Sequence, residues 1–201
     1  MYERKDPLHQ RAKREGYRSR AAYKLIELQK RARLVRRGHA VVDLGAWPGG
    51  WLQVAADLVG PSGRVVGIDR ASIEPLPLPN VTVLTGDVTD PDCIDRLRAA
   101  LGRRADVVLS DLAPKLTGIA PRDEAAFAEL AAATRTVAVA LLTHGGTLVT
   151  KTLGGREGEE ARATLRPLFA SVRQLGLDST RKGSSELYLV ATGRVKENPL
   201  D

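Results

Sequence analysis

The stretch VVDLGAWPGGW, residues 41–51, indicates the fold of the chain. An apolar segment with the composition of a strand leads into a turn that contains three glycines, Gly45, Gly49 and Gly50, and an apolar helical segment follows. A strand, a glycine-rich turn and a helix in this order are typical of nucleotide-type sites, because open α/β sheets bind ligands beyond the carboxyl ends of their strands. A tight turn that holds no ligand is the alternative interpretation.

The rest of the chain continues the alternation of short apolar segments with helical ones. Seven segments rich in Val, Leu and Thr predict strands, at 40–45, 64–69, 81–88, 105–112, 146–152, 171–177 and 186–193. Helices are expected at 50–59, 91–101, 122–142 and 157–170. This pattern predicts an α/β, Rossmann-like fold with a seven-stranded, mostly parallel sheet. Only a polar turn separates the last two strands, so we expect an antiparallel hairpin at one edge.

Charge is distributed unevenly along the 201 residues. Residues 1–40 contain 13 basic and 4 acidic residues, a balance of +9, whereas the whole chain carries only +7. We expect a basic helix at 20–34 with Ser19 as its N-cap. The basic N-terminal segment predicts a contact with nucleic acid, and a solvated helical face is the alternative.

One domain, 1–201, accounts for the pattern: a basic helical extension at 1–39, a Rossmann-like core at 40–194 and a tail at 195–201. No apolar run approaches the roughly 18 residues that suggest a membrane span. The N-terminus lacks the apolar region of a secretory signal. The single cysteine and three histidines show no metal-ligand spacing, so no metal site is expected.

The glycine turn favours one nucleotide ligand over another. A dinucleotide site has the spacing G-x-G-x-x-G, which this turn lacks. S-adenosylmethionine, which has no pyrophosphate, is therefore the leading candidate cofactor. Asp69 ends the second strand, where its carboxylate can accept the ribose hydroxyls of an adenosine, and Asp87 ends the third, where it can accept from the adenine amino group.

Three further polar residues lie at the ends of the remaining strands. Asp111 lies at the end of the fourth strand, Lys151 ends the fifth, and Glu186 opens the last. A lysine held between carboxylates can accept or orient the proton of a hydroxyl. Alternatively, Asp111 caps a helix and Lys151 forms an ordinary ion pair with Glu186.

Five motifs resemble the FtsJ/RlmE family of ribosomal RNA ribose 2′-O-methyltransferases. They are GYRSRAAYKLIEL, VVDLGAWPGGW, VVLSDLAP, VTKT and SSELYLVATG, which match in order and at family spacing over roughly residues 6 to 194. The resemblance implies an S-adenosylmethionine-dependent methyltransferase fold. The sequence departs from the family at Trp47, where a small residue is usual, at Lys115, where Asn is usual, and in the polar segment after Lys151.

The resemblance also implies a set of site residues. The catalytic set falls on Lys24, Asp111, Lys151 and Glu186, with Lys151 acting on the ribose hydroxyl and Lys24 orienting the nucleotide. Together with the glycine turn, the cofactor contacts fall on Gly45, Gly49, Gly50, Trp51, Asp69, Asp87 and Asp111. Candidate RNA contacts are Arg11, Lys13, Arg14, Arg18, Arg20 and Lys115.

The expected function is therefore methylation of a ribose 2′-hydroxyl, in a uridine, of large-subunit ribosomal RNA. The substrate is free RNA or the assembled large subunit. We expect a cytoplasmic monomer with no membrane partner, and a mitochondrial location is the alternative. Two rival functions stay open: a non-catalytic RNA-binding assembly factor, and a methyltransferase for protein or a small molecule. The four catalytic candidates disfavour the first, and the basic extension disfavours the second.

Overall fold

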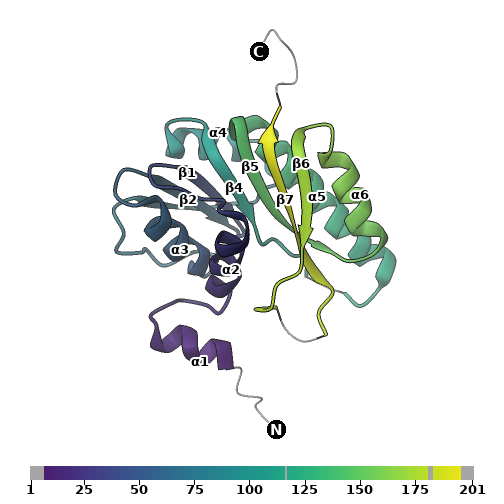
Figure 1. Ribbon diagram of the computed structural model, residues 1–201, viewed down its shortest axis with the longest axis horizontal. Coiled ribbons are helices and arrows are strands. Elements are labelled where there is room, and N and C mark those ends of the chain that lie inside the picture. The colour runs from purple at the N-terminus through teal and green to yellow at the C-terminus, as the bar shows by residue number, and fades with distance from the viewer. Residues whose placement is uncertain (1–6, 116, 181–182, 196–201) are drawn as a thin grey trace.

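The computed structural model describes residues 7–115, 117–180 and 183–195. Helices cover both faces of a single sheet (Figure 1). The helices are α1 (Pro7–Arg14), α2 (Ala22–Ala32), α3 (Gly50–Val59), α4 (Cys93–Leu101), α5 (Ala120–Leu141) and α6 (Arg156–Leu165). The strands are β1 (Ala40–Leu44), β2 (Arg64–Asp69), β3 (Val81–Thr85), β4 (Ala105–Ser110), β5 (Leu142–Leu153), β6 (Phe169–Leu175) and β7 (Glu186–Arg194). The first six residues of the expected extension and residues 196–201 of the expected tail lie outside the described residues.

The sheet has seven strands in the order β3-β2-β1-β4-β5-β7-β6. Neighbouring strands from β3 to β5 are parallel, and β7 runs antiparallel to both β5 and β6. The predicted fold class and antiparallel edge hairpin are therefore confirmed. Because β7 lies between β5 and β6, its first residues meet the end of β5 rather than the edge of the sheet.

The core has two halves, one on each face of the sheet. One half packs α2 and α3 against the sheet, and the other packs α4, α5 and α6. Along β1, Val41 belongs to the first half while Ala40, Val42 and Leu44 belong to the second, as the two-residue period of a strand requires. Within the described residues, no helix is both long and apolar enough to cross a membrane.

The N-terminal segment differs from the prediction at two points. A separate helix, α1, precedes the expected one, and Pro7 stands at its first position, where a missing N–H costs nothing. The helix predicted at 20–34 begins at Ala22, and Ser19 is not its cap, because the residue at that position is Ala21. The Ser19 hydroxyl instead lies against Gly50 of α3, where it is buried without a hydrogen-bond partner.

Two boundaries in the second half of the chain also differ. The helix predicted at 157–170 ends at Leu165, because Pro167 cannot continue it and Phe169 already begins β6. The strand predicted at 146–152 begins four residues earlier, directly after α5, and its pairing with β4 shifts register between Ala105 and Val107. The shift leaves Lys151 near the end of β5, as expected.

Candidate active site

Asp111 lies at the centre of a cluster of charged side chains. The Nζ of Lys151 donates to the Asp111 Oδ1 at 3.1 Å and to its backbone carbonyl at 2.5 Å. The Nζ of Lys24 lies 3.7 Å from the other carboxylate oxygen of Asp111 and 2.6 Å from Glu186 Oε1. Two lysines and two carboxylates therefore alternate within ion-pair distance. The structure brings all four predicted catalytic residues together.

Topology explains how residues distant in sequence meet. Asp111 directly follows β4, Lys151 lies near the end of the adjacent β5, and Glu186 begins β7 beside it, opposite Leu153. Lys24 comes from the first turns of α2, which packs on the same face of the sheet. The cluster is partly shielded from solvent, since the side chain of Lys151 is only 9% exposed. Charge interactions in such a setting are stronger than at an open surface.

Tyr188 completes the cluster, and its role was not predicted from the sequence. Its hydroxyl donates to Asp111 Oδ1 at 2.6 Å and also lies 3.2 Å from Glu186 Oε1. Burial, followed by the nearby carboxylates of Asp111 and Glu186, raises the pKa of Tyr188 far above its usual range, so the hydroxyl stays a donor. Its position two residues after Glu186 was the available signal, because residues i and i+2 of a strand share a face.

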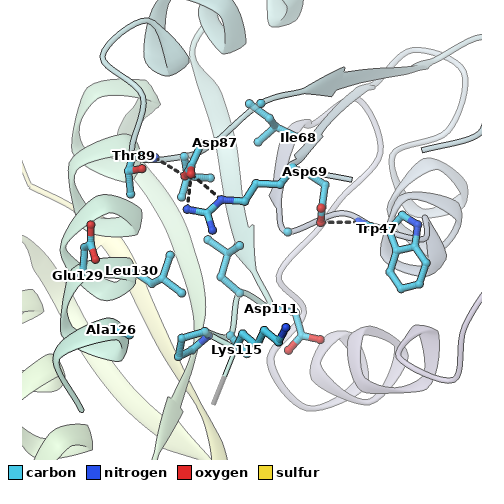
Figure 2. Close-up of a pocket in the computed structure, with 17 residues that line it drawn as sticks. Trp47, Ile68, Asp69, Asp87, Thr89, Asp111, Lys115, Ala126, Glu129 and Leu130 are labelled. Carbon is cyan, nitrogen blue, oxygen red and sulfur yellow. Dashed lines mark hydrogen bonds and ion pairs between the residues drawn. The ribbon is translucent and has the colours of Figure 1, made fainter. Parts of the chain in front are cut away.

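A cavity of about 480 Å³ opens next to the cluster (Figure 2). Its lining includes Gly45, Asp69, Asp87, Asp111 and Lys115 among the predicted residues. Gly49, Gly50 and Trp51 do not line it. This volume lies within the roughly 300–1,000 Å³ of small-molecule sites. Asp111 belongs to both the cavity and the cluster, so a ligand in the cavity would lie beside the lysines.

The acids that follow β2 and β3 lie apart in the cavity and are held differently (Figure 2). Asp69 accepts the backbone N–H of Trp47 at 3.0 Å and that of Ala71 at 2.8 Å, one on each oxygen. Asp87 accepts the N–H of Thr89 at 3.0 Å and forms an ion pair with Arg70. Although burial raises the pKa of Asp87, the bonds from Thr89 and Arg70 lower it below its usual value. Both carboxylates are thus fixed acceptors.

These acids suit an adenosine ligand with a positive charge. Each Asp69 oxygen accepts one backbone bond and keeps a free lone pair, so it can also receive a ribose hydroxyl. The acid-rich lining favours a cationic sulfonium over an anionic nucleotide phosphate. This set of acceptors therefore fits S-adenosylmethionine. Among the described residues, no group of three or more His, Cys, Asp or Glu side chains has the arrangement to hold a metal ion.

The glycines of the turn accommodate the protein's own chain. Gly49 has a φ of 110°, which side-chain-bearing residues rarely adopt, and a Cβ there would lie 3.1 Å from the side chain of Arg18. A Cβ at Gly50 would lie 2.4 Å from the Ser19 hydroxyl. Trp51 is buried, and its indole donates to the Ala21 carbonyl at 2.7 Å. The roles of these three residues as cofactor contacts stay predictions.

Asp43 is a buried acid that sequence reasoning did not consider. It lies within β1, is fully buried, and neither carboxylate oxygen has a hydrogen-bond partner. Burial raises its pKa well above the usual value, and the charges of Asp111 and Asp69 raise it further. The signal was present in VVDLG, where an acid interrupts an apolar strand.

The predicted RNA contacts separate into two groups. Arg18 donates to the carbonyls of Pro48, Glu74 and Pro75, and Arg20 donates to that of Ser179, so both link segments of the protein. Arg11 pairs with Glu15, while Lys13, Arg14 and Lys115 are exposed. No hydrogen bond or ion pair joins the side chain of Lys13 or Arg14 to another described residue. Contact with RNA stays a prediction for all six.

Comparison with known proteins gives a consistent result. A sequence model described as "FtsJ-like methyltransferase" matches residues 17–194. A ribosomal RNA large subunit methyltransferase E from Natronomonas pharaonis is 45% identical over 192 residues, covering 96% of this chain and 75% of the relative. A protein of the same name from Myxococcus xanthus is 42% identical over 193 residues, covering 96% of this chain and 91% of the relative.

Solved structures share the fold. A protein from Plasmodium falciparum named a ribosomal RNA methyltransferase superposes with a TM-score of 0.78 at 27% identity, covering 89% of this chain and 98% of that one. Fibrillarin from Aeropyrum pernix, solved with bound S-adenosyl-L-methionine, gives a TM-score of 0.61 at 19% identity, covering 88% of this chain and 75% of that one. The second likeness concerns the fold alone.

Proposed function

The chain belongs to the family of FtsJ-like methyltransferases, S-adenosylmethionine-dependent enzymes, and from this premise we propose that it methylates a ribose 2′-hydroxyl of large-subunit ribosomal RNA. The observation that carries the proposal is the Lys24–Asp111–Lys151–Glu186 cluster beside an acid-lined cavity. The cavity supports cofactor binding, and the cluster supports chemistry on a hydroxyl.

Within the cavity we assign the ribose of the cofactor to Asp69 and its adenine amino group to Asp87. Asp111 would lie near the methionine end, because it belongs to both the cavity and the cluster. Gly45, Gly49, Gly50 and Trp51 remain further candidate contacts from the turn. When bound, S-adenosylmethionine supplies an electrophilic methyl group.

The cluster would prepare the hydroxyl that receives this group. As the oxygen–carbon bond would form and the sulfonium sulfur–carbon bond would break, leaving S-adenosylhomocysteine, the hydroxyl must lose its proton, and Lys151 is the group we assign to accept or orient it. Asp111 accepts hydrogen bonds from both Lys151 and Tyr188, so Tyr188 helps to hold the carboxylate that positions Lys151. Lys24, held by Glu186, would orient the target nucleotide. Alignment of this kind supplies much of the acceleration in a bimolecular transfer.

The finer parts of the proposal concern the substrate and its setting. We propose a uridine as the target, in free RNA or in the assembled large subunit. We also propose that the protein acts as a monomer in the cytoplasm, in line with the prokaryotic relatives. Among the predicted RNA contacts, the exposed basic side chains of Lys13, Arg14 and Lys115 are the best-placed cations for phosphate contacts.

The test uses the purified protein, radiolabelled S-adenosylmethionine, and large ribosomal subunits or deproteinised large-subunit RNA from cells that lack the protein. We expect ribose methylation at a discrete site, mapped by the resistance of 2′-O-methylated linkages to alkaline cleavage. The Lys151→Ala protein, mixed with the same substrates, should leave the site unmethylated. RNA binding without methyl transfer by the wild type would support the non-catalytic assembly factor instead.

A further inference from the structure

Trp47 is the most exposed large hydrophobic side chain among the described residues. Its side chain is 59% exposed, and the other two large hydrophobics with exposed side chains in this part of the chain are isoleucines, Ile26 and Ile119. The other described aromatic side chains are buried or half-buried. A single exposed isoleucine is ordinary. An indole has the largest surface to bury of any side chain, so leaving it exposed to water loses the most hydrophobic stabilisation.

The backbone on both sides of this indole is fixed. The N–H of Trp47 donates to Asp69 Oδ2 at 3.0 Å, and the carbonyl of Pro48 accepts from Arg18 at 3.3 Å. The same guanidinium holds the carbonyls of Glu74 and Pro75 at 2.5 and 2.8 Å. The turn is therefore anchored to β2 and to the segment after it. An anchored aromatic ring needs little ordering when a ligand binds.

The indole lies at one end of the cofactor cavity. Figure 2 shows it beyond Asp69, while Asp87 and Thr89 occupy the opposite end. Asp111, which belongs to the charged cluster, lines the same cavity, and so does the exposed Lys115. Trp47 thus combines exposure, a fixed backbone and proximity to the cavity beside which the hydroxyl would react.

We propose that Trp47 is a stacking platform for a base of the substrate RNA, either the target base or its neighbour. The inference rests on the proposed function, since it places the base beside the cavity and cluster. Proteins that bind single-stranded RNA commonly stack its splayed-out bases on aromatic side chains. Every base offers a π face, so such a platform tolerates any sequence.

An adenine of the cofactor is the other planar group available, and the structure favours RNA over it. The adenine acceptor we assign, Asp87, lies at the far end of the cavity from Trp47. Trp47 is 59% exposed, so much of its surface is open to a ligand other than the cofactor. An isolated ring also lacks the contiguous apolar patch of a protein-docking surface.

Fluorescence gives a direct test, because the chain has only two tryptophans and the other, Trp51, is 4% exposed. The probes are a ten-nucleotide oligoadenylate RNA and an abasic oligomer of the same length and charge, each added with saturating S-adenosylhomocysteine. We expect the base-bearing oligomer to quench the emission and the abasic one to leave it nearly unchanged. Trp47→Phe should abolish the quench.

Affinity measurements complete the test. Trp47→Ala should weaken binding of the base-bearing oligomer by about 5- to 150-fold, the range for one base stack, and leave the abasic oligomer unaffected. Trp47→Phe should retain most of the affinity, and Ile26→Ala, which removes another exposed hydrophobic side chain, should retain all of it. Unchanged binding of the base-bearing oligomer by Trp47→Ala would overturn the inference.

Three outcomes can also be told apart. A quench produced by S-adenosylhomocysteine alone, with no further change on adding RNA, would assign the indole to the cofactor and overturn the RNA platform. If the wild type binds neither oligomer and methylates no ribosomal RNA, the proposed function itself fails and the platform with it. If the wild type methylates RNA and Trp47→Ala binds both oligomers normally, only the platform is wrong.

Discussion

Asp111 connects side chains from two different strands and one helix. Its carboxylate receives Lys151 from β5 and Tyr188 from β7, and it lies 3.7 Å from Lys24 of α2. Because Asp111 accepts several bonds at once, losing any one partner leaves the others in place. Substitution of one partner should therefore test its role in methyl transfer without disrupting the rest of the site.

Lys151 provides the first such separation. Lys151→Ala should leave the affinities for S-adenosylmethionine and RNA within a few-fold, but reduce single-turnover methyl transfer by about 10²- to 10⁴-fold, the range for a positioned acid–base group. Rapid-quench measurement with labelled cofactor gives the rate. Transfer near the wild-type rate would mean that the cluster is not the catalytic centre.

Lys151→Arg distinguishes two roles of the same charge. Arginine keeps the cation but does not release a proton at working pH, and its planar fork needs different geometry. A variant that transfers methyl groups at most of the wild-type rate would show that Lys151 acts as a fixed charge. A variant as slow as Lys151→Ala would support proton acceptance, provided that its cofactor affinity is intact.

Asp43 should make the stability of the protein depend on pH. Its folded-state pKa is raised above the unfolded value, because burial disfavours the charged form. Stabilisation is therefore complete below the unfolded pKa, about 3.9, and is lost as the pH rises toward the folded-state pKa. Asp43→Asn removes this loss, so the variant should gain stability over the wild type by up to about 1.4 kcal/mol per pH unit in that window.

Urea unfolding of both proteins at pH 5, 6, 7 and 8 measures the difference. Asp57→Asn, which removes an exposed carboxylate from α3, controls for the loss of one negative charge. If the free energies of unfolding of wild type and Asp43→Asn run parallel over this range, Asp43 does not change its charge on unfolding. The prediction would then be wrong.

Sequence reasoning located residues well where the strand pattern and a motif agreed. Asp111 and Lys151 were placed at the ends of adjacent parallel strands, and Glu186 at the start of a strand that runs antiparallel to β5, so all three meet on one side of the sheet. Tyr188, Asp43 and Arg70 were missed, although the position of Tyr188 and the acid within VVDLG were visible signals. Their roles depend on what surrounds them, on burial for Asp43 and on the Asp87 carboxylate for Arg70.

At the scale of elements, α2 is fastened to the segment that leads into β7. Glu27 accepts the backbone N–H groups of Asp178 and Ser179 at 2.9 and 3.0 Å, and the Ser179 hydroxyl at 2.8 Å. Arg31 pairs with Glu27 and donates to the carbonyl of Gly176 at 2.6 Å. Lys24 lies one turn before Glu27 on the same helix. The fastening therefore holds the helix that carries Lys24.

Glu27→Ala should reveal this fastening. Because the change leaves two backbone donors without their acceptor, we expect a loss of about 1.5–3 kcal/mol in the free energy of unfolding. Methyl transfer should fall as well, since α2 would hold Lys24 less firmly against Glu186. Urea unfolding and single-turnover rates are the two measurements. Glu160→Ala on α6, which breaks an exposed ion pair with Arg156, is the control and should cost no more than about 1 kcal/mol.

Both measurements are needed to judge the fastening. A stability loss without any change in methyl transfer at saturating substrate would show that Glu27 supports the fold but does not position Lys24. No loss beyond that of Glu160→Ala would contradict the fastening altogether.

Element boundaries were harder to predict than element types. The sequence indicated all seven strands, because apolar segments alternate with polar turns, yet β5 begins four residues early through a register shift that no local pattern encodes. The helix α1 was not separated from the basic extension, since eight residues without an acid in the first turn give a weak helix signal. Ser19 resembled a cap but packs on Gly50, a contact made between distant segments.

At the scale of the whole molecule, the basic residues gather at one end of the chain. Residues 1–40 carry a balance of +9, while the rest of the chain carries −2. Figure 1 shows α1 at the periphery, on the far side of α2 and α3 from most of the sheet. Much of this charge serves the fold, because Arg18, Arg20 and Arg31 donate to backbone carbonyls. The surplus available to RNA is therefore smaller than the sequence suggests.

Lys13 and Arg14 of α1 are the test of that surplus, because both are exposed and neither is paired with another described residue. Changing both to Ala should flatten the log–log dependence of RNA affinity on salt by about 0.7 per phosphate released on a single strand, hence by about 1.4 for two contacts. Affinity for S-adenosylmethionine should not change, since neither residue lines the cavity.

A charge-matched control separates a local contact from net charge. Arg122→Ala with Arg166→Ala removes two exposed positive charges from α5 and the end of α6, on the opposite face of the sheet from α2 and α3. Fluorescence anisotropy of a labelled RNA oligomer at several salt concentrations gives each slope. If both double variants flatten the slope equally, only net charge matters. If neither does, α1 is a solvated surface that makes no phosphate contact. A cation that neutralises a phosphate releases counterions, so such a contact must weaken as the salt concentration rises.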